Sequence, residues 1–214
     1  MKIENQEKIW DSIAIPWKTF KNLNSLPEAV DFLRNKKGKI LDLGCGSGRN
    51  FTKIDGIIYG VDFSEEMLRL AKIHAKELGV EVKLKKADAW KTGFSDNFFD
   101  AAVCTAVIHC ITSEENRKNS LMELFRILKP GAEAWATVWD KNQERFEDSG
   151  KEVIIPWKYE GKDYQRYYYL YDADEFVGLL KDVGFEIVRV NNKEDKKGFN
   201  SKRNIEVVAR KPLD

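Results

Sequence analysis

A short apolar run followed by closely spaced glycines is the most informative feature of this chain. The segment covers residues 40–48 and reads ILDLGCGSG. Glycines let backbone N–H groups approach a ligand closely, and they can adopt positive φ. Asp42 precedes the first glycine by two residues, so it should lie at the carboxyl end of a strand. The third glycine comes one residue earlier than in a dinucleotide fingerprint, which disfavours a nicotinamide dehydrogenase.

Two further acidic residues follow predicted strands. A strand over residues 57–61 runs into Asp62, which comes 18 residues after Gly44. An acidic group at an offset of about 20 residues meets ribose hydroxyls in doubly wound folds. A strand over residues 82–86 is followed by Asp88. These carboxylates should therefore face one ligand, and the alternative is that Asp62 and Asp88 are ordinary turn residues.

The elements that must position these residues alternate between strands and helices. This alternation predicts an α/β fold with a parallel sheet covered on both faces. The last two predicted strands have no helix between them, so they should pair antiparallel. Besides those above, strands are expected at residues 100–107, 132–139, 186–190 and 205–209, and helices at 64–78, 114–128 (capped by Ser113 and stopped by Lys129, Pro130 and Gly131) and 172–183.

Length and composition favour one domain over residues 1–214, in which 43% apolar residues can fill a core. The net charge of +1 gives no general attraction for nucleic acid, so RNA binding would need a local patch or a partner. The three cysteines form no C-x-x-C pair, so neither a disulfide framework nor a metal site is predicted. We expect a cytoplasmic protein without a signal peptide or a membrane-spanning helix.

Two regions outside this alternation are candidates for the substrate side. Residues 1–36 carry several aromatic side chains and should form a partly helical cap over the cofactor site, or else a helix on the flank of the sheet. Residues 140–171 form an insertion with six tyrosines and Arg166. Arg166 could hold a carboxylate or phosphate while a tyrosine stacks on a base. Alternatively, the tyrosines extend the hydrophobic cover and Arg166 reaches water.

The two histidines lead to different expectations. His109 follows the predicted fourth strand, where it could act as a base or orient a substrate. The alternative is a buried histidine that is hydrogen-bonded to the backbone. His74 lies in the helix predicted over residues 64–78 and is expected at the surface. Residues 191–204 are polar and carry five Lys or Arg residues, so we expect a mobile hairpin tip, with RNA phosphate contact as the alternative.

The glycine turn and the three strand-end carboxylates together resemble class I S-adenosylmethionine (SAM) methyltransferases. The resemblance implies a Rossmann-like, seven-stranded, mostly parallel sheet whose last strand is antiparallel, and SAM as the cofactor. It also implies that Asp42 faces the amino group of the methionine moiety, Asp62 the ribose hydroxyls and Asp88 the adenine amino group. The full set of cofactor-binding residues it implies is Asp42, Gly44, Cys45, Gly46, Gly48, Asp62, Phe63, Met67, Asp88, Ala89 and Thr105.

A narrower resemblance covers residues 10–209. The segments 105–109, 129–131, 138–139, 155–157 and 165–171 look like the tRNA wobble-uridine methyltransferases, which esterify 5-carboxymethyluridine. This resemblance implies tRNA and a small zinc-binding activator protein as partners. It makes Arg166 the residue that holds the acceptor carboxylate and lets His109 shape the pocket. The remaining residues that it places on the substrate side are Trp157, Tyr167 and Tyr168.

Some residues depart from this family, and the acceptor decides the chemistry. The family usually has histidines where this chain has Cys110 and Tyr169, and its N-terminal Thr-Arg dipeptide has no clear match. A carboxylate acceptor is ionised at neutral pH and needs no base. A hydroxyl acceptor would need His109 as a base. The alternative functions are a small-molecule O- or N-methyltransferase and a non-catalytic SAM-binding subunit.

Overall fold

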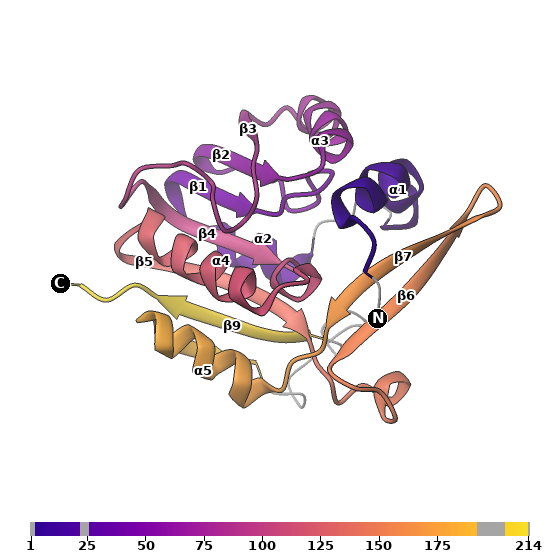
Figure 1. The fold of residues 1–214 in the computed structure, drawn as a ribbon. Coiled ribbons are helices and arrows are strands. Elements are labelled where there is room, and N and C mark those ends of the chain that lie inside the picture. Colours follow the sequence, from indigo (N-terminus) through magenta and orange to yellow (C-terminus); the bar gives the residue numbers. More distant parts are fainter. Residues whose placement is uncertain (1–2, 22–25, 192–203, 214) are drawn as a thin grey trace.

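A single seven-stranded sheet forms the centre of the molecule (Figure 1). The structure is a computed structural model that describes residues 3–21, 26–191 and 204–213. The strand order is β3-β2-β1-β4-β5-β9-β8, and β9 runs antiparallel to both of its neighbours. The predicted fold class is therefore confirmed. The strands are β1 (Lys37–Leu43), β2 (Asp55–Asp62), β3 (Val82–Lys86), β4 (Phe99–Thr105), β5 (Leu128–Trp139), β8 (Glu186–Val190) and β9 (Asn204–Arg210).

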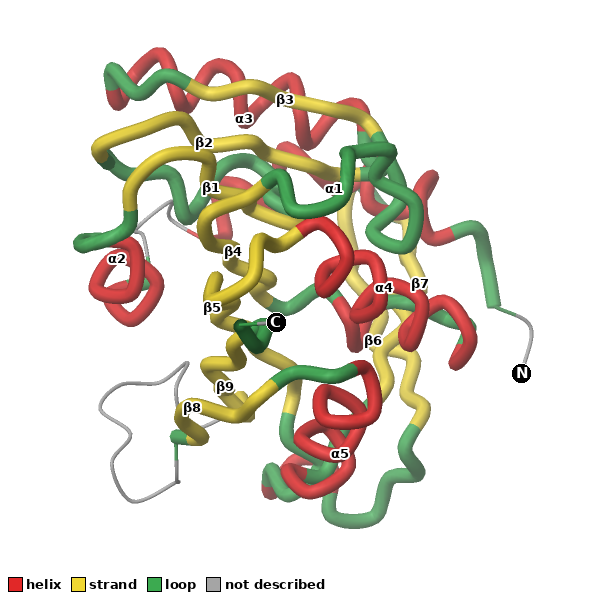
Figure 2. The backbone as a smooth tube through the Cα atoms, turned by 90° about the vertical axis from the view of Figure 1, so that its left-hand side faces the viewer, coloured by secondary structure: helices red, strands yellow, loops and turns green. Residues whose placement is uncertain are grey.

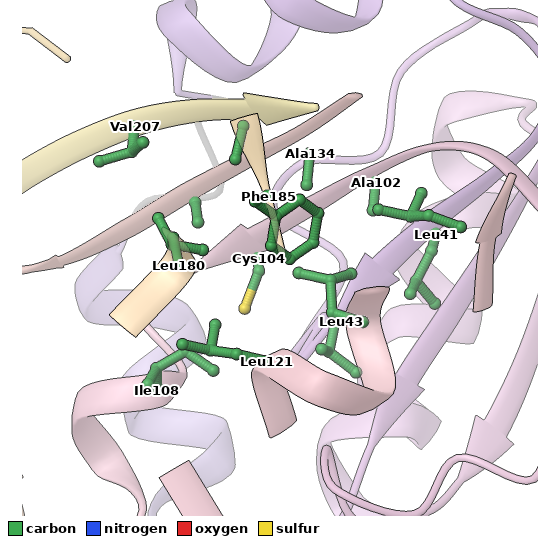
Figure 3. Close-up of a cluster of buried hydrophobic side chains, with 14 of the residues drawn as sticks. Leu41, Leu43, Ala102, Cys104, Ile108, Leu121, Ala134, Leu180, Phe185 and Val207 are labelled. Carbon is green, nitrogen blue, oxygen red and sulfur yellow. The ribbon is translucent and has the colours of Figure 1, made fainter. Parts of the chain in front are cut away.

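Helices cover both faces of this sheet (Figure 2). Helices α4 (Glu114–Ile127) and α5 (Ala173–Val183) lie on one face, where the largest cluster of buried apolar side chains forms. Figure 3 shows Leu121 and Leu180 from these helices against side chains of the strands. The other face is covered by α2 (Pro27–Leu33) and α3 (Glu65–Leu78). This cover buries the central strands β4 and β9 on both sides, as their apolar runs predict.

Local end signals set the helix bounds close to those predicted. The Ser64 and Ser113 side chains accept backbone N–H bonds at the starts of α3 and α4. Asp172 forms a capping box with Glu175 at the start of α5, which ends at Gly184 in a left-handed conformation.

Two local expectations were wrong. The strand expected over residues 132–139 begins earlier, because β5 starts at Leu128, directly after α4 ends, and carries Lys129, Pro130 and Gly131 as an irregular stretch opposite the start of β4. His74 is not at the surface but only 6% exposed. It lies two helical turns after Met67, which places it on the buried face of α3.

The N-terminal segment supplies two helices in different places. Helix α1 (Gln6–Lys21) packs against α3 and the insertion (Figure 1). Helix α2 packs on the flank of the sheet, against side chains such as Ile40 and Trp135. No helix in the described ranges is long and apolar enough to cross a membrane. The loop expected over residues 191–204 lies almost wholly outside the described residues.

The insertion contains a β-hairpin that we did not predict. Its strands are β6 (Glu152–Tyr159) and β7 (Lys162–Tyr169), which pair antiparallel beside α1 (Figure 1). Glu160 and Gly161 connect them, with φ of 47° and 73°. Positive φ at both central residues is typical of the tight type I′ hairpin turn. The Glu-Gly pair between two runs of strand-forming residues was the available signal.

Candidate functional site

A cavity of about 260 Å³ lies where the strands of the sheet end. Its wall is built from the glycine turn after β1, the ends of β2 and β4, the loop after β3, and residues of α1, β5 and β7. This is the carboxyl edge of the sheet, at the switch between β1 and β4 where open α/β folds bind ligands. Eleven predicted site residues line it: Gly44, Cys45, Gly46, Asp62, Phe63, Met67, Asp88, Ala89, Thr105, His109 and Tyr168.

Five predicted site residues are not part of this wall. They are Asp42, Gly48, Trp157, Arg166 and Tyr167. Other lining residues were missed, because tertiary packing rather than a local motif brings them to the cavity. They include Gln6 from α1, Arg49 and Asn50 after the glycine turn, Trp90 after β3, and Trp139 at the end of β5. Trp10 and Trp17 of α1 also line the cavity, and they belong to the aromatic N-terminal segment that was expected to cap it.

The glycine turn has one crowded and one open position. Gly44 has φ +69°, and a Cβ there would lie 2.2 Å from Val107 Cγ2. Gly46 has φ +51°, and the nearest atom to a Cβ there would be Met67 Sδ at 3.9 Å. The backbone at Gly46 can therefore be approached closely by a ligand, as a cofactor turn requires.

Asp62 ties the glycine turn to the start of α3. Its Oδ2 accepts the Gly46 N–H at 2.8 Å, and its Oδ1 accepts the Ser64 N–H at 2.9 Å. Burial raises the pKa of Asp62 to about 6, although these backbone bonds oppose the shift. Since an ionised carboxylate can accept about four hydrogen bonds, the side chain retains acceptor capacity toward the cavity.

Asp42 lies behind the cavity wall and is 1% exposed. Its Oδ1 accepts a long bond from Asn50 Nδ2 at 3.4 Å, while Oδ2 has no hydrogen-bond partner within the described residues. Burial raises the pKa of Asp42 to about 7. Asn50 Nδ2 also donates to Thr105 Oγ1 at 3.1 Å, so this amide links the ends of β1 and β4. The unpaired buried oxygen suits a cationic donor.

The loop after β3 completes the other end of the cavity. Asp88 lines it and is held near β2 through the adjacent backbone, where the Ala87 N–H donates to the Asp62 carbonyl at 3.1 Å. Burial raises the pKa of Asp88. The three strand-end carboxylates are thus brought to one region, as expected for parallel strands.

His109 is a buried histidine whose orientation is fixed by the backbone. Its Nδ1 accepts the Trp139 N–H at 3.2 Å, and its ring stacks on Trp139 with 5.2 Å between centroids. A neutral imidazole with an occupied Nδ1 lone pair carries its proton on Nε2. His109 is therefore arranged as a hydrogen-bond donor at Nε2, and protonation of Nδ1 would break the bond to Trp139.

Arg166 lies behind Tyr168 in an aromatic cage. Its guanidinium carbon is 5.0 Å from the Trp17 ring centroid, 5.1 Å from that of Trp157 and 5.5 Å from that of Tyr168. Arg166 Nη1 donates to the Tyr168 hydroxyl at 2.9 Å. Arg166 is only 6% exposed. The alternative expectation, in which Arg166 reaches water, is therefore wrong.

Tyr167 faces the other side of the hairpin. Its hydroxyl donates to Glu152 Oε1 at 2.8 Å and accepts a bond from Arg117 Nη1 at 3.3 Å. Strand alternation explains this difference between neighbouring tyrosines, because successive side chains of β7 point to opposite faces. Tyr168 is thus on the cavity side and Tyr167 on the core side.

Comparison with known proteins places this cavity in a family context. Residues 41–136 match the model of the methyltransferase domain. The chain is 32% identical over 173 residues to the tRNA (carboxymethyluridine(34)-5-O)-methyltransferase of Schizosaccharomyces pombe, covering 69% of this chain and 73% of that protein. The Arabidopsis thaliana protein of the same name is longer, and the match spans 33% of it at 31% identity.

Solved structures share the fold. A SAM-dependent methyltransferase from Methanosarcina mazei superposes with a TM-score of 0.71 at 25% identity, covering 89% of this chain and all of that one. A complex of the Haloferax volcanii Trm112 methyltransferase activator with a protein described as a methyltransferase matches with a TM-score of 0.73. That match covers 97% of this chain and 98% of the other at 16% identity, so it indicates the shared fold alone.

Proposed function

Because the chain belongs to the class I SAM-dependent methyltransferases, we propose that it forms the methyl ester of 5-carboxymethyluridine at the wobble position of tRNA. The name of the S. pombe relative and its coverage of most of this chain support this acceptor. We further propose that residues 1–214 act as one domain, with α1 as a cap and residues 140–171 on the substrate side. The proposed partners are cytoplasmic tRNA and an activator of the kind seen in the Haloferax complex.

Two carboxylates of the cavity wall, and a third that lies behind it, support the cofactor proposal. The spare acceptor capacity of Asp62 suits the ribose hydroxyls, and the unpaired Oδ2 of Asp42 suits the cationic amino group. Asp88 lines the cavity and is proposed to accept a hydrogen bond from the adenine amino group. The open side of Gly46 leaves room for the ligand. Gly48 serves the turn differently, since a Cβ there would lie 2.6 Å from Phe51 Cε2. When bound, SAM supplies an electrophilic methyl group.

The orientation of His109 is the observation that carries the choice of acceptor. A hydroxyl acceptor needs a base, but the Nδ1 of His109 is occupied by the Trp139 N–H and its proton lies on Nε2. A carboxylate acceptor is already ionised. One of its oxygens forms the C–O bond while the bond from the methyl carbon to sulfur breaks, and the electron pair stays on sulfur. No proton is transferred, so His109 is needed only as a donor.

The proposal is tested by transfer of labelled methyl groups from SAM to tRNA that carries 5-carboxymethyluridine, with and without a Trm112-type activator. We expect labelled tRNA whose label is released as methanol by mild alkali, because esters hydrolyse under conditions in which N-methyl groups and ethers survive. The control is tRNA that carries unmodified uridine at the wobble position, which should remain unlabelled.

Other outcomes would point to the alternative functions. Alkali-stable label would rule out ester formation and require a base for the acceptor. Labelled small molecules without labelled tRNA would indicate a small-molecule methyltransferase. Binding of SAM without any transfer would indicate a non-catalytic subunit.

The raised pKa of Asp42 predicts that cofactor affinity depends on pH. Asp42 must be ionised to hold an amino cation, and its pKa is about 7. We therefore expect the Kd for S-adenosylhomocysteine to fall about tenfold from pH 6 to pH 8, as the ionised fraction rises. Titration calorimetry at both pH values checks this. Asp42→Asn should bind more weakly and keep only the smaller pH dependence caused by Asp62, whose pKa is about 6.

The same shift has the opposite sign for the ligand-free protein. The folded-state pKa of Asp42 lies above the ordinary aspartate value of 3.8, so the folded state binds more protons between about pH 4 and pH 7. The contribution of Asp42 to folding stability is therefore lost as the pH rises through this range.

A tenfold weaker Kd at pH 8 than at pH 6 would contradict the assignment of Asp42 to the amino group.

A further inference from the structure

We propose that Tyr168 is the residue that contacts the acceptor carboxylate, and that Arg166 acts through Tyr168 as a positioning residue. This inference rests on the proposed function and names the acceptor-side donor within it. It differs from the interpretation based on resemblance, in which the Arg166 guanidinium holds the carboxylate directly.

The direction of one hydrogen bond is the first argument. Arg166 can only donate, so the Tyr168 oxygen is the acceptor in the bond of 2.9 Å between them. The Tyr168 hydroxyl hydrogen must therefore point to a different acceptor. Among the described residues, no such acceptor for this hydroxyl is found, although Tyr168 is only 2% exposed. A buried donor of this kind calls for a partner supplied by a ligand.

The second argument is position. Tyr168 lines the cavity together with His109 and Trp139, whereas Arg166 does not. The Tyr168 ring stacks on Trp139 with 4.1 Å between centroids and an angle of 19° between planes. This stacking fixes the ring of a cavity-lining residue, so the position of its hydroxyl is fixed as well.

The third argument is charge. Within the described part of the chain, no carboxylate forms an ion pair with Arg166, and its Nε has no hydrogen-bond partner. The guanidinium is held by the aromatic rings of Trp17, Trp157 and Tyr168 instead. A buried positive charge bonded to the phenol oxygen polarises the O–H group and makes it a stronger donor to an anion.

This arrangement suits the chemistry of ester formation. A hydrogen bond to the attacking oxygen would reduce its nucleophilicity, so Tyr168 should hold the other carboxylate oxygen. Binding would then favour an acid over a neutral amide of the same shape. The preference for the acid form is thus the property that Tyr168 and Arg166 should control together.

The test uses Tyr168→Phe, which removes only the hydroxyl and keeps the stacked ring. In methyl transfer to tRNA carrying 5-carboxymethyluridine, we expect kcat/KM to fall roughly 10- to 150-fold, the usual effect of losing a bond to a charged group. Binding of S-adenosylhomocysteine should be unchanged. Tyr164→Phe, on the same strand but outside the cavity wall, is the matched control and should keep full activity.

A double-mutant cycle separates the two roles. If Arg166 acts through Tyr168, adding Arg166→Met to Tyr168→Phe should cause little further loss of activity. With Tyr168 intact, Arg166→Lys should be more active than Arg166→Met, because lysine keeps the positive charge. Additive losses would overturn the inference, because they would mean that Arg166 contacts the acceptor independently. Full activity of Tyr168→Phe would overturn it as well.

A binding experiment keeps the inference testable if tRNA is not the acceptor. The wild-type protein saturated with S-adenosylhomocysteine is titrated with uracil-5-acetic acid and with uracil-5-acetamide. We expect a preference for the acid that disappears in Tyr168→Phe. Equal binding of acid and amide by the wild type would overturn the inference, whereas a lack of methyl transfer to tRNA would overturn only the proposed function.

Discussion

Replacing Asp62 by alanine is expected to weaken S-adenosylhomocysteine binding by roughly 10- to 150-fold. The loss of hydrogen bonds to a charged group costs about 1.5–3 kcal/mol. In our proposal, Asp62 accepts hydrogen bonds from the ribose hydroxyls. It also accepts the Gly46 and Ser64 N–H groups, which holds the glycine turn against the start of α3. The variant thus loses both the acceptor and the shape of the turn. Titration calorimetry measures the change.

The matched control lies at the other end of the same strand. Asp55 begins β2, pairs with Lys37 at the surface and does not line the cavity. Asp55→Ala should bind S-adenosylhomocysteine like the wild type, because Asp55 lies outside the cavity. The variant should also stay folded, since an exposed ion pair contributes little to stability. Equal affinities of Asp62→Ala and the wild type would exclude Asp62 from ribose recognition.

Gly56→Ala should cause a large loss of stability, about 1–3 kcal/mol or more. A Cβ at Gly56 would lie 2.0 Å from the Gly38 carbonyl oxygen and 2.6 Å from the Gly38 nitrogen, in the register where β1 pairs with β2. Both contacts are with the backbone, so the strands would have to separate to relieve them. This loss is a large fraction of the 5–15 kcal/mol that typically stabilises a domain. Urea unfolding with an unchanged m-value measures it.

Gly178→Ala provides the control for the same substitution. Gly178 lies within α5, and no atom is found within 4 Å of a Cβ built there. Alanine should therefore stabilise the helix by about 0.5–1 kcal/mol. A similar stability of the two variants would show that the close contact between β1 and β2 does not limit the packing of the sheet.

The central sheet could be predicted because its strands are buried on both faces. Such strands appear as continuous apolar runs, and the strand predicted over residues 100–107 is observed as Phe99–Thr105. The start of β5 was missed because Pro130 and Gly131 usually end an element, whereas pairing of Leu128 with Phe99 draws this stretch into the sheet. Tertiary pairing overrode the local signal.

The hairpin shows how one missed element changes a site prediction. Strand β6 contains Pro156, which made the region look irregular. Once β7 is known to be a strand, its period of two separates Arg166 and Tyr168 from Tyr167. The sequence therefore indicated a segment that borders the cavity, but not which of its side chains reach it.

The strand-end residues of the cavity wall were easier to predict than the rest of the wall. Asp62 and Asp88 follow strands directly, so the strand pattern already determines where they lie. Trp10 and Trp17 reach the cavity because α1 docks across the sheet edge; their aromatic cluster favoured a cap, but the sequence did not distinguish this from packing on the flank of the sheet. Asp42 follows the expected motif but lies behind the wall, since the Asn50 side chain occupies its Oδ1.

Helix α1 connects the hairpin of the insertion with the start of α3. It is fastened to β7 by Gln6, which donates to the Gln165 carbonyl at 3.1 Å and accepts the Tyr167 N–H at 3.0 Å. It is fastened to the start of α3 by Asp11, which accepts from Ser64 Oγ at 2.5 Å. Gln6 and Trp10 of α1 lie near these two contacts and line the cavity. A movement of α1 that opens the cofactor side of the cavity would therefore also change the wall on the hairpin side. In our proposal, release of S-adenosylhomocysteine and release of the methylated product would then both depend on the position of this one helix.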